Sequence, residues 1–295
     1  MKKPITIALL IFLESISLVF SQKRLPKTTA ARPAMYIIKV INSKEPTIGH
    51  ECYRDKENIS NLFEQIAATL EIELKQQTVT GKDFGKANVL KAIANIHPGK
   101  DDIVVFYYSG HGFRFKGEKD RPFPQLDLRT PPPVYSAEVI NASTQNAEEI
   151  LDLVKAKGAR LNIVLGDCCN AEIEFYRRFP NEGGMAAPPT LYDKQVTEML
   201  FLKTQGSLLM TAAKKGQYAV ADELKGGIFT FEFNDVMETF LLDPDAKPSW
   251  KEIFDMTRKK TKADAAGYDC KGIGCVQEPI YVIKDNKGVV VNKAL

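Results

Sequence analysis

The chain has 295 residues with apolar and charged residues in ordinary globular proportion, which fits one large α/β domain or two small ones. Lysine and arginine exceed aspartate and glutamate by only three, 40 against 37, and the excess is not gathered into a basic stripe. This balance argues against nucleic acid as the main partner of the protein.

The N-terminal segment differs in character from the rest of the chain. Two lysines precede an apolar stretch that is interrupted by Glu14 and ends in a small residue at Ser21. This order is typical of a secretory signal peptide. A membrane anchor is the alternative, but a span needs about 20 clean apolar residues. We therefore expect residues 1–21 to be a signal peptide and residues 22–33 a linker. The mature protein would then be secreted or periplasmic, without a membrane association.

Cysteine usage fits an oxidising compartment. The chain has five cysteines, Cys52, Cys168, Cys169, Cys270 and Cys275. An odd number in an exported protein leaves at least one thiol free or paired with another molecule. Cys270 and Cys275 flank the short sequence KGIG, and we predict a disulfide between them. Zinc is the competing interpretation, but the chain has no CxxC pair and only three histidines, so we predict no metal.

From residue 34 onward, predicted strands alternate with predicted helices. Short apolar runs, and one more polar run, predict six strands at 35–41, 72–79, 103–108, 161–165, 207–211 and 280–283. Helical spacing predicts helices at 55–70, 88–96, 147–157, 229–242 and 250–262. Strands separated by helices favour a mainly parallel sheet of about six strands, covered on both faces. We expect a single domain over residues 34–295.

Two irregular segments interrupt this pattern. Residues 113–134 are rich in proline and too long for a simple connection, which indicates a functional loop. Residues 170–204 contain the stretch NEGGMAAPP, which cannot form a regular element.

The chemistry is concentrated in the loops after two of the buried strands. IVVFYY runs into SGHG, which contains His111, and LNIVL runs into GDCCN, which contains Cys168 and Cys169. Open parallel sheets carry functional groups beyond the carboxyl ends of their strands. Neighbouring strands lie about 4.8 Å apart, so a histidine and a cysteine from these loops could meet. Such a pair is a known nucleophile arrangement, and the N–H groups of Gly112 and Cys169 could form its oxyanion hole. Each motif alone is more often an ordinary loop histidine or a buried cysteine.

These segments resemble a known family. DDIVVFYYSGHG is similar to the histidine segment of metacaspases and bacterial caspase-like peptidases, and NIVLGDCCN is similar to their nucleophile segment. The interval from His111 to Cys169 is 58 residues, close to the roughly 50 residues typical of caspases. LLMTAAKKGQYAVADELKGGIFTFEF is similar to the next strand and the following helix start of the family. The resemblance covers most of residues 35–281.

The resemblance implies a fold and a reaction. It implies a caspase-like three-layer α/β/α sandwich and a cysteine endopeptidase that acts on proteins or peptides. In the family an Asp or Gln lies two residues before the nucleophile, and Asp167 stands there relative to Cys169. His111 and Cys169 are therefore the implied catalytic dyad, with Cys168 where metacaspases have serine. The chain departs from the family at Asn170-Ala171-Glu172, where His-Ser-Gly is usual, and at Ala213, where serine is common.

The same resemblance implies a substrate preference. Asp167 lines the pocket for the P1 side chain in the family register, and Cys52-Tyr53-Arg54-Asp55 matches a second acidic motif that would add Asp55. Two carboxylates in one pocket favour Arg or Lys at P1 and disfavour Asp. The alternative for Asp55 is that it caps its helix.

Regulation is implied less specifically. Residues 170–204 occupy the place of the linker that caspases cleave, and they offer Arg177, Arg178 and Lys194 as sites of self-cleavage. Calcium activation, known for many metacaspases, is not assigned to residues, and no other cofactor is expected. The oligomeric state is left open.

Two other functions remain as alternatives. A caspase-like protein that binds partners without cutting them would fit the altered sequence after Cys169. A nucleotide-binding α/β domain fits less well, because no GxGxxG motif follows the first strand.

Overall fold

The computed structural model describes residues 32–130, 136–172, 191–270 and 272–295. The chain divides into two units, Met1–Arg32 and Pro33–Leu295, and the description below concerns the second. The predicted signal peptide and nearly all of the predicted linker lie outside the described residues. None of the described helices is long and apolar enough to cross a membrane.

A seven-stranded sheet forms the centre of the described unit, in the order β12-β11-β8-β7-β3-β1-β2. Five strands run parallel, and β11 and β12 pair antiparallel at one edge. The strands are β1 (Ala34–Ile41), β2 (Glu73–Thr80), β3 (Ile103–Ser109), β7 (Leu161–Asp167), β8 (Gly206–Thr211), β11 (Ile280–Lys284) and β12 (Val290–Ala294).

The predicted number of about six strands was too low by one. β12 was missed because Val290–Ala294 is partly exposed and lacks the continuous apolar pattern of the buried strands. β2 is polar for a related reason, since it forms the opposite edge of the sheet. The mainly parallel order is confirmed, since β2, β1, β3, β7 and β8 pair in parallel. β3 and β7 are buried on both faces, as expected for central strands of such a sheet.

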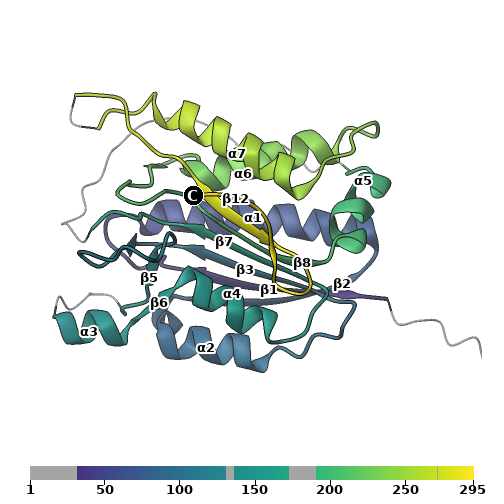
Figure 1. Ribbon diagram of the computed structural model, residues 1–295, viewed down its shortest axis with the longest axis horizontal. Coiled ribbons are helices and arrows are strands. Elements are labelled where there is room, and N and C mark those ends of the chain that lie inside the picture. Colours follow the sequence, from purple (N-terminus) through teal and green to yellow (C-terminus); the bar gives the residue numbers. More distant parts are fainter. Residues whose placement is uncertain (1–31, 131–135, 173–190, 271) are drawn as a thin grey trace, which may run out of the picture. The chain divides into compact units, whose positions relative to one another are not determined.

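Helices cover both faces of the sheet, as Figure 1 shows. One layer contains α1 (Gly49–Leu70), α5 (Lys194–Glu198), α6 (Ile228–Leu241) and α7 (Trp250–Ala265). The other contains α2 (Lys86–Asn95) and α4 (Ala147–Lys155). Alternate residues of β3 serve the two layers: Val105 and Tyr107 pack in the first core, and Val104 and Phe106 pack in the second.

The start of α1 differs from the prediction. The helix begins at Gly49, six residues before the predicted start at Asp55. Asp55 therefore lies inside the helix and is buried, so it does not cap the helix. The predicted bounds of the other four helices differ from those in the structure by at most three residues, and the starts of α4 and α7 agree with the prediction.

Short elements fill the connections. They are the 3₁₀ turn η1 (Gly81–Asp83), β4 (Gly112–Phe113), β5 (Gln125–Asp127), α3 (Ala137–Ala142), β6 (Thr144–Asn146), the π-helical turn η2 (Met199–Lys203), β9 (Ala221–Asp222) and β10 (Gly226–Gly227). β4, β5 and β6 form a small sheet: β4 lies at the start of the proline-rich segment, β5 within it and β6 beyond its end. This sheet extends the loop that carries His111 and gives it a fixed path.

The predicted disulfide between Cys270 and Cys275 is present in the structure. Cys275 packs with Val220, Ile228 and Tyr268 in a small apolar cluster. The disulfide loop thus supports both the start of α6 and the segment that follows β8.

Candidate active site

The loops that carry His111 and Cys169 are neighbours. β3 and β7 pair in parallel with Ser109 opposite Asp167, and each of the two residues follows its strand end by two positions. The N–H of Gly110 donates to the carbonyl of Asp167 at 3.2 Å, so the pairing continues beyond the strands. The two loops therefore leave the same edge of the sheet side by side.

Gly112 allows a very close approach of the two loops. A Cβ atom at this position would lie 2.6 Å from the Cys168 sulfur and 2.6 Å from the Cys169 carbonyl oxygen. Any other residue would push the loops apart. The two predicted oxyanion donors, the N–H groups of Gly112 and Cys169, accordingly belong to adjoining backbone segments.

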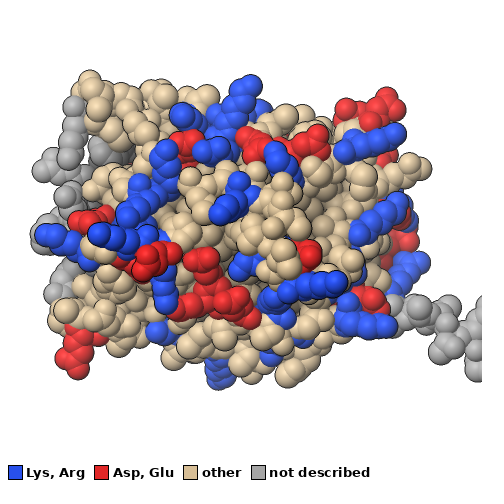
Figure 2. Space-filling view, in the orientation of Figure 1, with Lys and Arg blue, Asp and Glu red and all other residues tan. Residues whose placement is uncertain are grey.

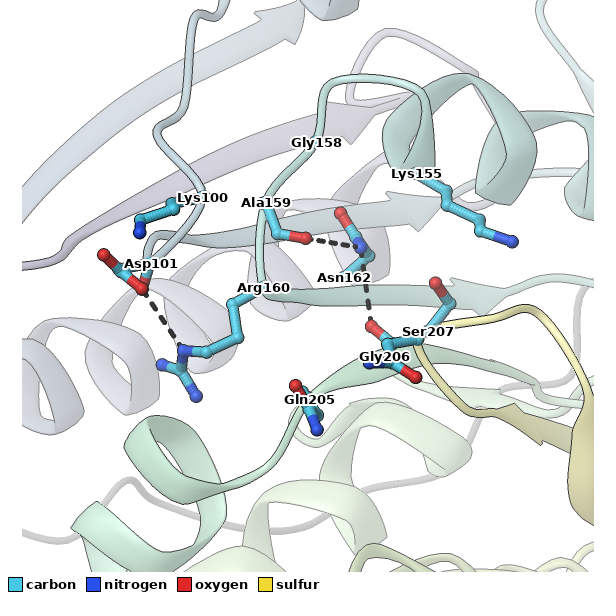
Figure 3. Close-up of a pocket in the computed structure, with 11 residues that line it drawn as sticks. Lys100, Asp101, Lys155, Gly158, Ala159, Arg160, Asn162, Gln205, Gly206 and Ser207 are labelled. Atoms are coloured by element: carbon cyan, nitrogen blue, oxygen red, sulfur yellow. Dashed lines mark hydrogen bonds between the residues drawn. The ribbon is translucent and has the colours of Figure 1, made fainter.

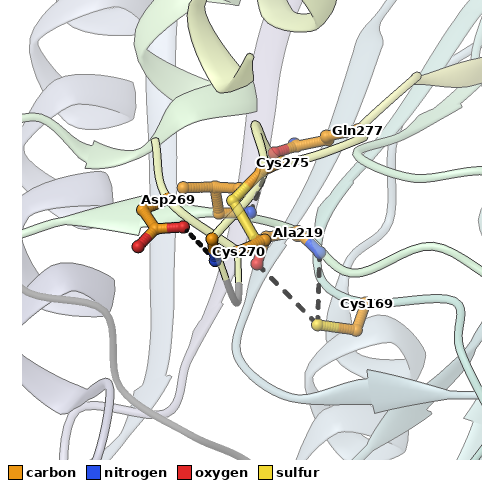
Figure 4. The surroundings of a disulfide bond; sticks show 8 residues. Cys169, Ala219, Asp269, Cys270, Cys275 and Gln277 are labelled. Carbon is orange, nitrogen blue, oxygen red and sulfur yellow. Dashed lines mark hydrogen bonds between the residues drawn. A yellow bond between two sulfur atoms is a disulfide. The ribbon is translucent and has the colours of Figure 1, made fainter. Parts of the chain in front are cut away.

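The two adjacent cysteines have different surroundings. Cys168 is buried in the core on the α2 and α4 side, and burial raises its pKa well above the usual thiol value. Cys169 is partly exposed, and its sulfur accepts the N–H of Ala219 at 3.3 Å and lies 3.9 Å from the Ala219 carbonyl (Figure 4). Burial of the sulfur raises the pKa of Cys169 to about 11 despite the Ala219 N–H. The Cys169 thiol is therefore protonated at neutral pH.

His111 is buried and held through its main chain. Its carbonyl accepts the Tyr108 hydroxyl at 2.6 Å and the Asp127 N–H at 3.0 Å. Its Nε2 atom lies 3.4 Å from a carboxylate oxygen of Glu45 and 3.4 Å from the Thr47 hydroxyl. We did not predict Glu45 from the sequence. The signal that would have found it is the rule used for the other loops, because Glu45 follows the carboxyl end of β1, the neighbour of β3.

Asp55 and Asp167 converge beneath this edge of the sheet. Asp55 is 2 % exposed and accepts the Ser109 hydroxyl at 2.6 Å and the Gly227 N–H at 2.7 Å. Asp167 is 6 % exposed and accepts the Thr230 N–H at 3.0 Å and the Thr230 hydroxyl at 2.7 Å. The start of α6 thus bridges the two carboxylates, one from α1 and one from β7.

Electrostatics couple the two carboxylates. Burial raises the pKa of Asp55 well above its ordinary range, and the nearby charge of Asp167 raises it further. Burial also raises the pKa of Asp167, to about 6, although the hydrogen bonds from Thr230 oppose the change. Two buried acids that share one site do not readily ionise together. A cation placed between them would relieve this repulsion.

The chain itself covers the carboxylates. A Cβ atom at Gly227 would lie 2.0 Å from a carboxylate oxygen of Asp167, so only glycine permits this contact. The backbone at 226–227 therefore lies directly against both carboxylates.

Asn170 stands where the resemblance led us to expect histidine. It is completely buried, and its amide accepts from the Arg114 guanidinium at 2.9 Å and donates to the carbonyls of Pro122 and Ala213 at 2.8 and 3.1 Å. The side chain therefore joins the segment after Cys169 to the proline-rich segment and to the end of β8. Its hydrogen bonds fix the path of the backbone that carries Cys169.

A cavity of about 370 Å³ lies at the other end of the sheet, where β7 and β8 begin (Figure 3). Its lining includes Lys100, Lys155 and Arg160, and the Arg160 guanidinium donates to the carbonyls of Asp101, Phe201 and Thr204. The cavity is thus remote from His111 and Cys169, which follow the carboxyl ends of β3 and β7.

Two observations concern surface charge and possible metal ligands. On the face shown in Figure 2, acidic and basic side chains are interspersed and neither sign forms a continuous stripe. Among the described residues, no group of three or more His, Cys, Asp or Glu side chains could hold a metal ion.

Comparisons with known proteins identify a family and a similar fold. The family model of the caspase domain matches residues 41–286. Among solved structures, caspase-1 from Spodoptera frugiperda aligns with a TM-score of 0.50 and 11 % identity, over 85 % of this chain and 86 % of that one. A structural-genomics protein from Geobacter sulfurreducens aligns with a TM-score of 0.47 and 16 % identity, over 86 % of this chain and 94 % of that one.

No curated protein matches the chain. The family match spans most of the described unit, including both loops and both carboxylates. The caspase-1 alignment independently supports a caspase-like α/β fold. The chain belongs to the caspase domain family of cysteine peptidases.

Proposed function

We propose that the protein is a cysteine endopeptidase in which His111 and Cys169 form the catalytic dyad. One observation carries this proposal: the register of β3 and β7 starts both loops from paired residues, Ser109 and Asp167, at the same edge of the sheet. The tight contact at Gly112 supports it, because this glycine lies directly against the backbone of Cys169, whose N–H is the second proposed oxyanion donor.

The protonation state of the Cys169 thiol determines what His111 has to do. Because the pKa of Cys169 is raised to about 11, the sulfur needs a base to become a nucleophile near neutral pH. His111 would take the proton as the sulfur attacks the peptide carbonyl, and it would return the proton to the leaving amine. Water would then hydrolyse the acyl-enzyme with His111 again as the base. The N–H groups of Gly112 and Cys169 would stabilise the oxyanion in both steps.

Specificity for Arg or Lys at P1 belongs to the same proposal. Its support is the convergence of Asp167 and Asp55, two buried carboxylates whose raised pKa values favour a cationic partner. An acidic P1 side chain would meet like charge there, and a cationic one would pair with it. A cationic P1 side chain would have to displace Gly227, whose N–H donates a hydrogen bond to the Asp55 carboxylate.

A fluorogenic peptide series that differs only at P1 tests this function. The full mature chain should cleave peptides with Arg or Lys at P1 at least a hundredfold faster than those with Asp or Leu. Asp167→Ala should remove most of this preference while the variant remains folded by circular dichroism. Efficient cleavage after Asp, with the basic peptides untouched, would overturn the specificity and leave the dyad standing.

An inactive binding protein is the second candidate function. It is favoured by the contacts that occupy the site, since Ala219 holds the Cys169 sulfur and Gly227 covers Asp167. A peptide electrophile with Arg at P1 separates the two functions. A peptidase would be labelled at Cys169 and not at Cys168, whereas an inactive protein would remain unlabelled.

Export and processing complete the proposal. Cleavage near Ser21 is read by N-terminal sequencing of the exported protein, since residues 1–31 lie outside the described residues. Arg177 and Arg178, two of the three predicted self-cleavage sites, also lie outside them. Lys194, the third, is the first residue of α5 and pairs with Glu71 at 3.0 Å. We assign no residues to calcium.

A further inference from the structure

Glu45 lies in the loop that joins β1 to α1, next to the loop that carries His111. β1 is the sheet neighbour of β3, with Ile41 opposite Ser109, and the N–H of Asn42 donates to the Ser109 carbonyl at 3.0 Å. The glutamate is 8 % exposed, and its Oε2 atom is 3.4 Å from Nε2 of His111. A carboxylate is therefore buried against the imidazole at the predicted catalytic edge.

The Glu45 carboxylate is held in place by hydrogen bonds from residues other than His111. Oε2 of Glu45 accepts the N–H groups of Thr47 and Ile48 at 2.6 and 3.0 Å, together with the Thr47 hydroxyl. The carbonyl of Glu45 accepts the N–H of Gly49 at 2.9 Å, at the first residue of the 22-residue helix α1. Three hydrogen bonds to the carboxylate and one to the backbone carbonyl thus determine where Glu45 lies.

The same contacts keep the carboxylate ionised. Burial alone would raise the pKa of Glu45, but the hydrogen bonds from His111 and Thr47 outweigh it and lower the pKa to about 2. An ionised carboxylate only accepts hydrogen bonds. The Nε2 atom that faces it must carry a hydrogen, which leaves the lone pair of the neutral ring on Nδ1.

We propose that Glu45 is a positioning residue that holds His111 in the tautomer protonated at Nε2, which puts the lone pair that accepts the Cys169 proton on Nδ1. Glu45 also stabilises the imidazolium that forms when this proton is transferred. The role in turnover rests on the proposed function, whereas the tautomer assignment does not.

Capping of α1 is the merely structural role that Glu45 could have. Glu45→Gln separates the two roles, because the amide oxygen still accepts the N–H groups of Thr47 and Ile48 while the negative charge is lost. Glu57→Gln is the matched control. Glu57 lies exposed on α1, and its substitution removes one negative charge at a position that does not face His111. A purely structural role would lower the thermal denaturation midpoint and leave kcat of the folded enzyme unchanged.

Two measurements test the inference. In the full chain, ¹⁵N NMR of the neutral His111 ring should show the hydrogen on Nε2, with His50 and His97 as internal references and His111→Gln for assignment. In turnover of an Arg peptide, Glu45→Gln should lower kcat about a hundredfold and change KM less than threefold. Glu57→Gln should change neither constant.

The NMR result tests the tautomer of His111, and the kinetic result tests the role of Glu45 in turnover. A neutral His111 protonated at Nδ1, or a kcat in Glu45→Gln within twofold of wild type, would overturn the inference. If the wild-type chain cleaves no peptide, the proposed function fails, and the same NMR measurement in wild type and Cys169→Ala still decides whether Glu45 sets the tautomer.

Discussion

The two ends of the central strands differ in what they offer a ligand. Where β7 and β8 begin, the structure has an open cavity of about 370 Å³ lined by Lys100, Lys155 and Arg160. Where β3 and β7 end, the chain packs tightly, with Ala219 on the Cys169 sulfur and Gly227 on Asp167. This cavity and the candidate catalytic residues therefore lie at opposite ends of the sheet.

In this protein, the chemistry of the side chains identifies the candidate active site better than the volume of a cavity does. The guanidinium of Arg160 is committed to three backbone carbonyls, so it stabilises the connections at its end of the sheet. The Cys169 thiol and the carboxyls of Asp55 and Asp167 at the other end have raised pKa values, and perturbed pKa values cluster at functional sites. The N–H of Ala219 contacts the Cys169 sulfur and Gly227 lies against Asp167, so these two segments pack directly on the candidate site.

The largest expected effect is the loss of turnover when a catalytic residue at the carboxyl end of β3 or β7 is substituted. Cys169→Ala and His111→Ala should each lower turnover of an Arg peptide by about 10⁴-fold, because the nucleophile or its base is lost. Cys168→Ala should keep most of the activity, since that sulfur lies in the core on the opposite face. Steady-state kinetics of the purified mature chain measures both. Full activity in Cys169→Ala would refute the dyad.

A second effect concerns stability and pH at the catalytic end. Because the pKa of Asp167 is raised to about 6 from an ordinary value of 3.8, the native state holds a proton that the unfolded chain has released between these pH values. The free energy of unfolding should therefore fall as pH rises through this window, by on the order of 3 kcal/mol. The amide side chain of the Asp167→Asn variant does not titrate. As pH rises from 4 to 7, the free energy of unfolding of wild type should therefore fall relative to that of this variant.

Urea denaturation at pH 4, 5, 6 and 7 measures the change, with Asp245→Asn as the control at an exposed position. The control should follow wild type at every pH. A stability difference between wild type and Asp167→Asn that stays constant across the range would show that Asp167 is not desolvated in solution.

The smallest effect is expected at the cavity. Arg160→Met should lower the free energy of unfolding by about 2 kcal/mol, because three carbonyls lose a donor, and should leave kcat and KM unchanged. Lys100→Met, an exposed change at the same cavity, should cost less than about 0.5 kcal/mol. Loss of turnover in a folded Arg160→Met protein would contradict the separation of the two ends.

The local sequence pattern was enough to identify the strands of the catalytic edge. IVVFYY and LNIVL are apolar on every residue except Asn162, and both became strands buried on both faces. The pairing of the following loops was predicted from the rule that parallel strands end at the same edge. The disulfide was also predictable, because its two cysteines are separated by only four residues.

Tertiary structure alone decided the remaining features. Glu45 and His111 are 66 residues apart in the chain, and Asp55 and Gly227 are 172 apart, so no periodicity or spacing relates them. The start of α1 was misjudged because its first turn contains few apolar residues and is stabilised by the backbone contacts of Glu45. Local patterns specify which residues are buried. The fold determines which buried charges meet, because that depends on the order in which the strands join the sheet.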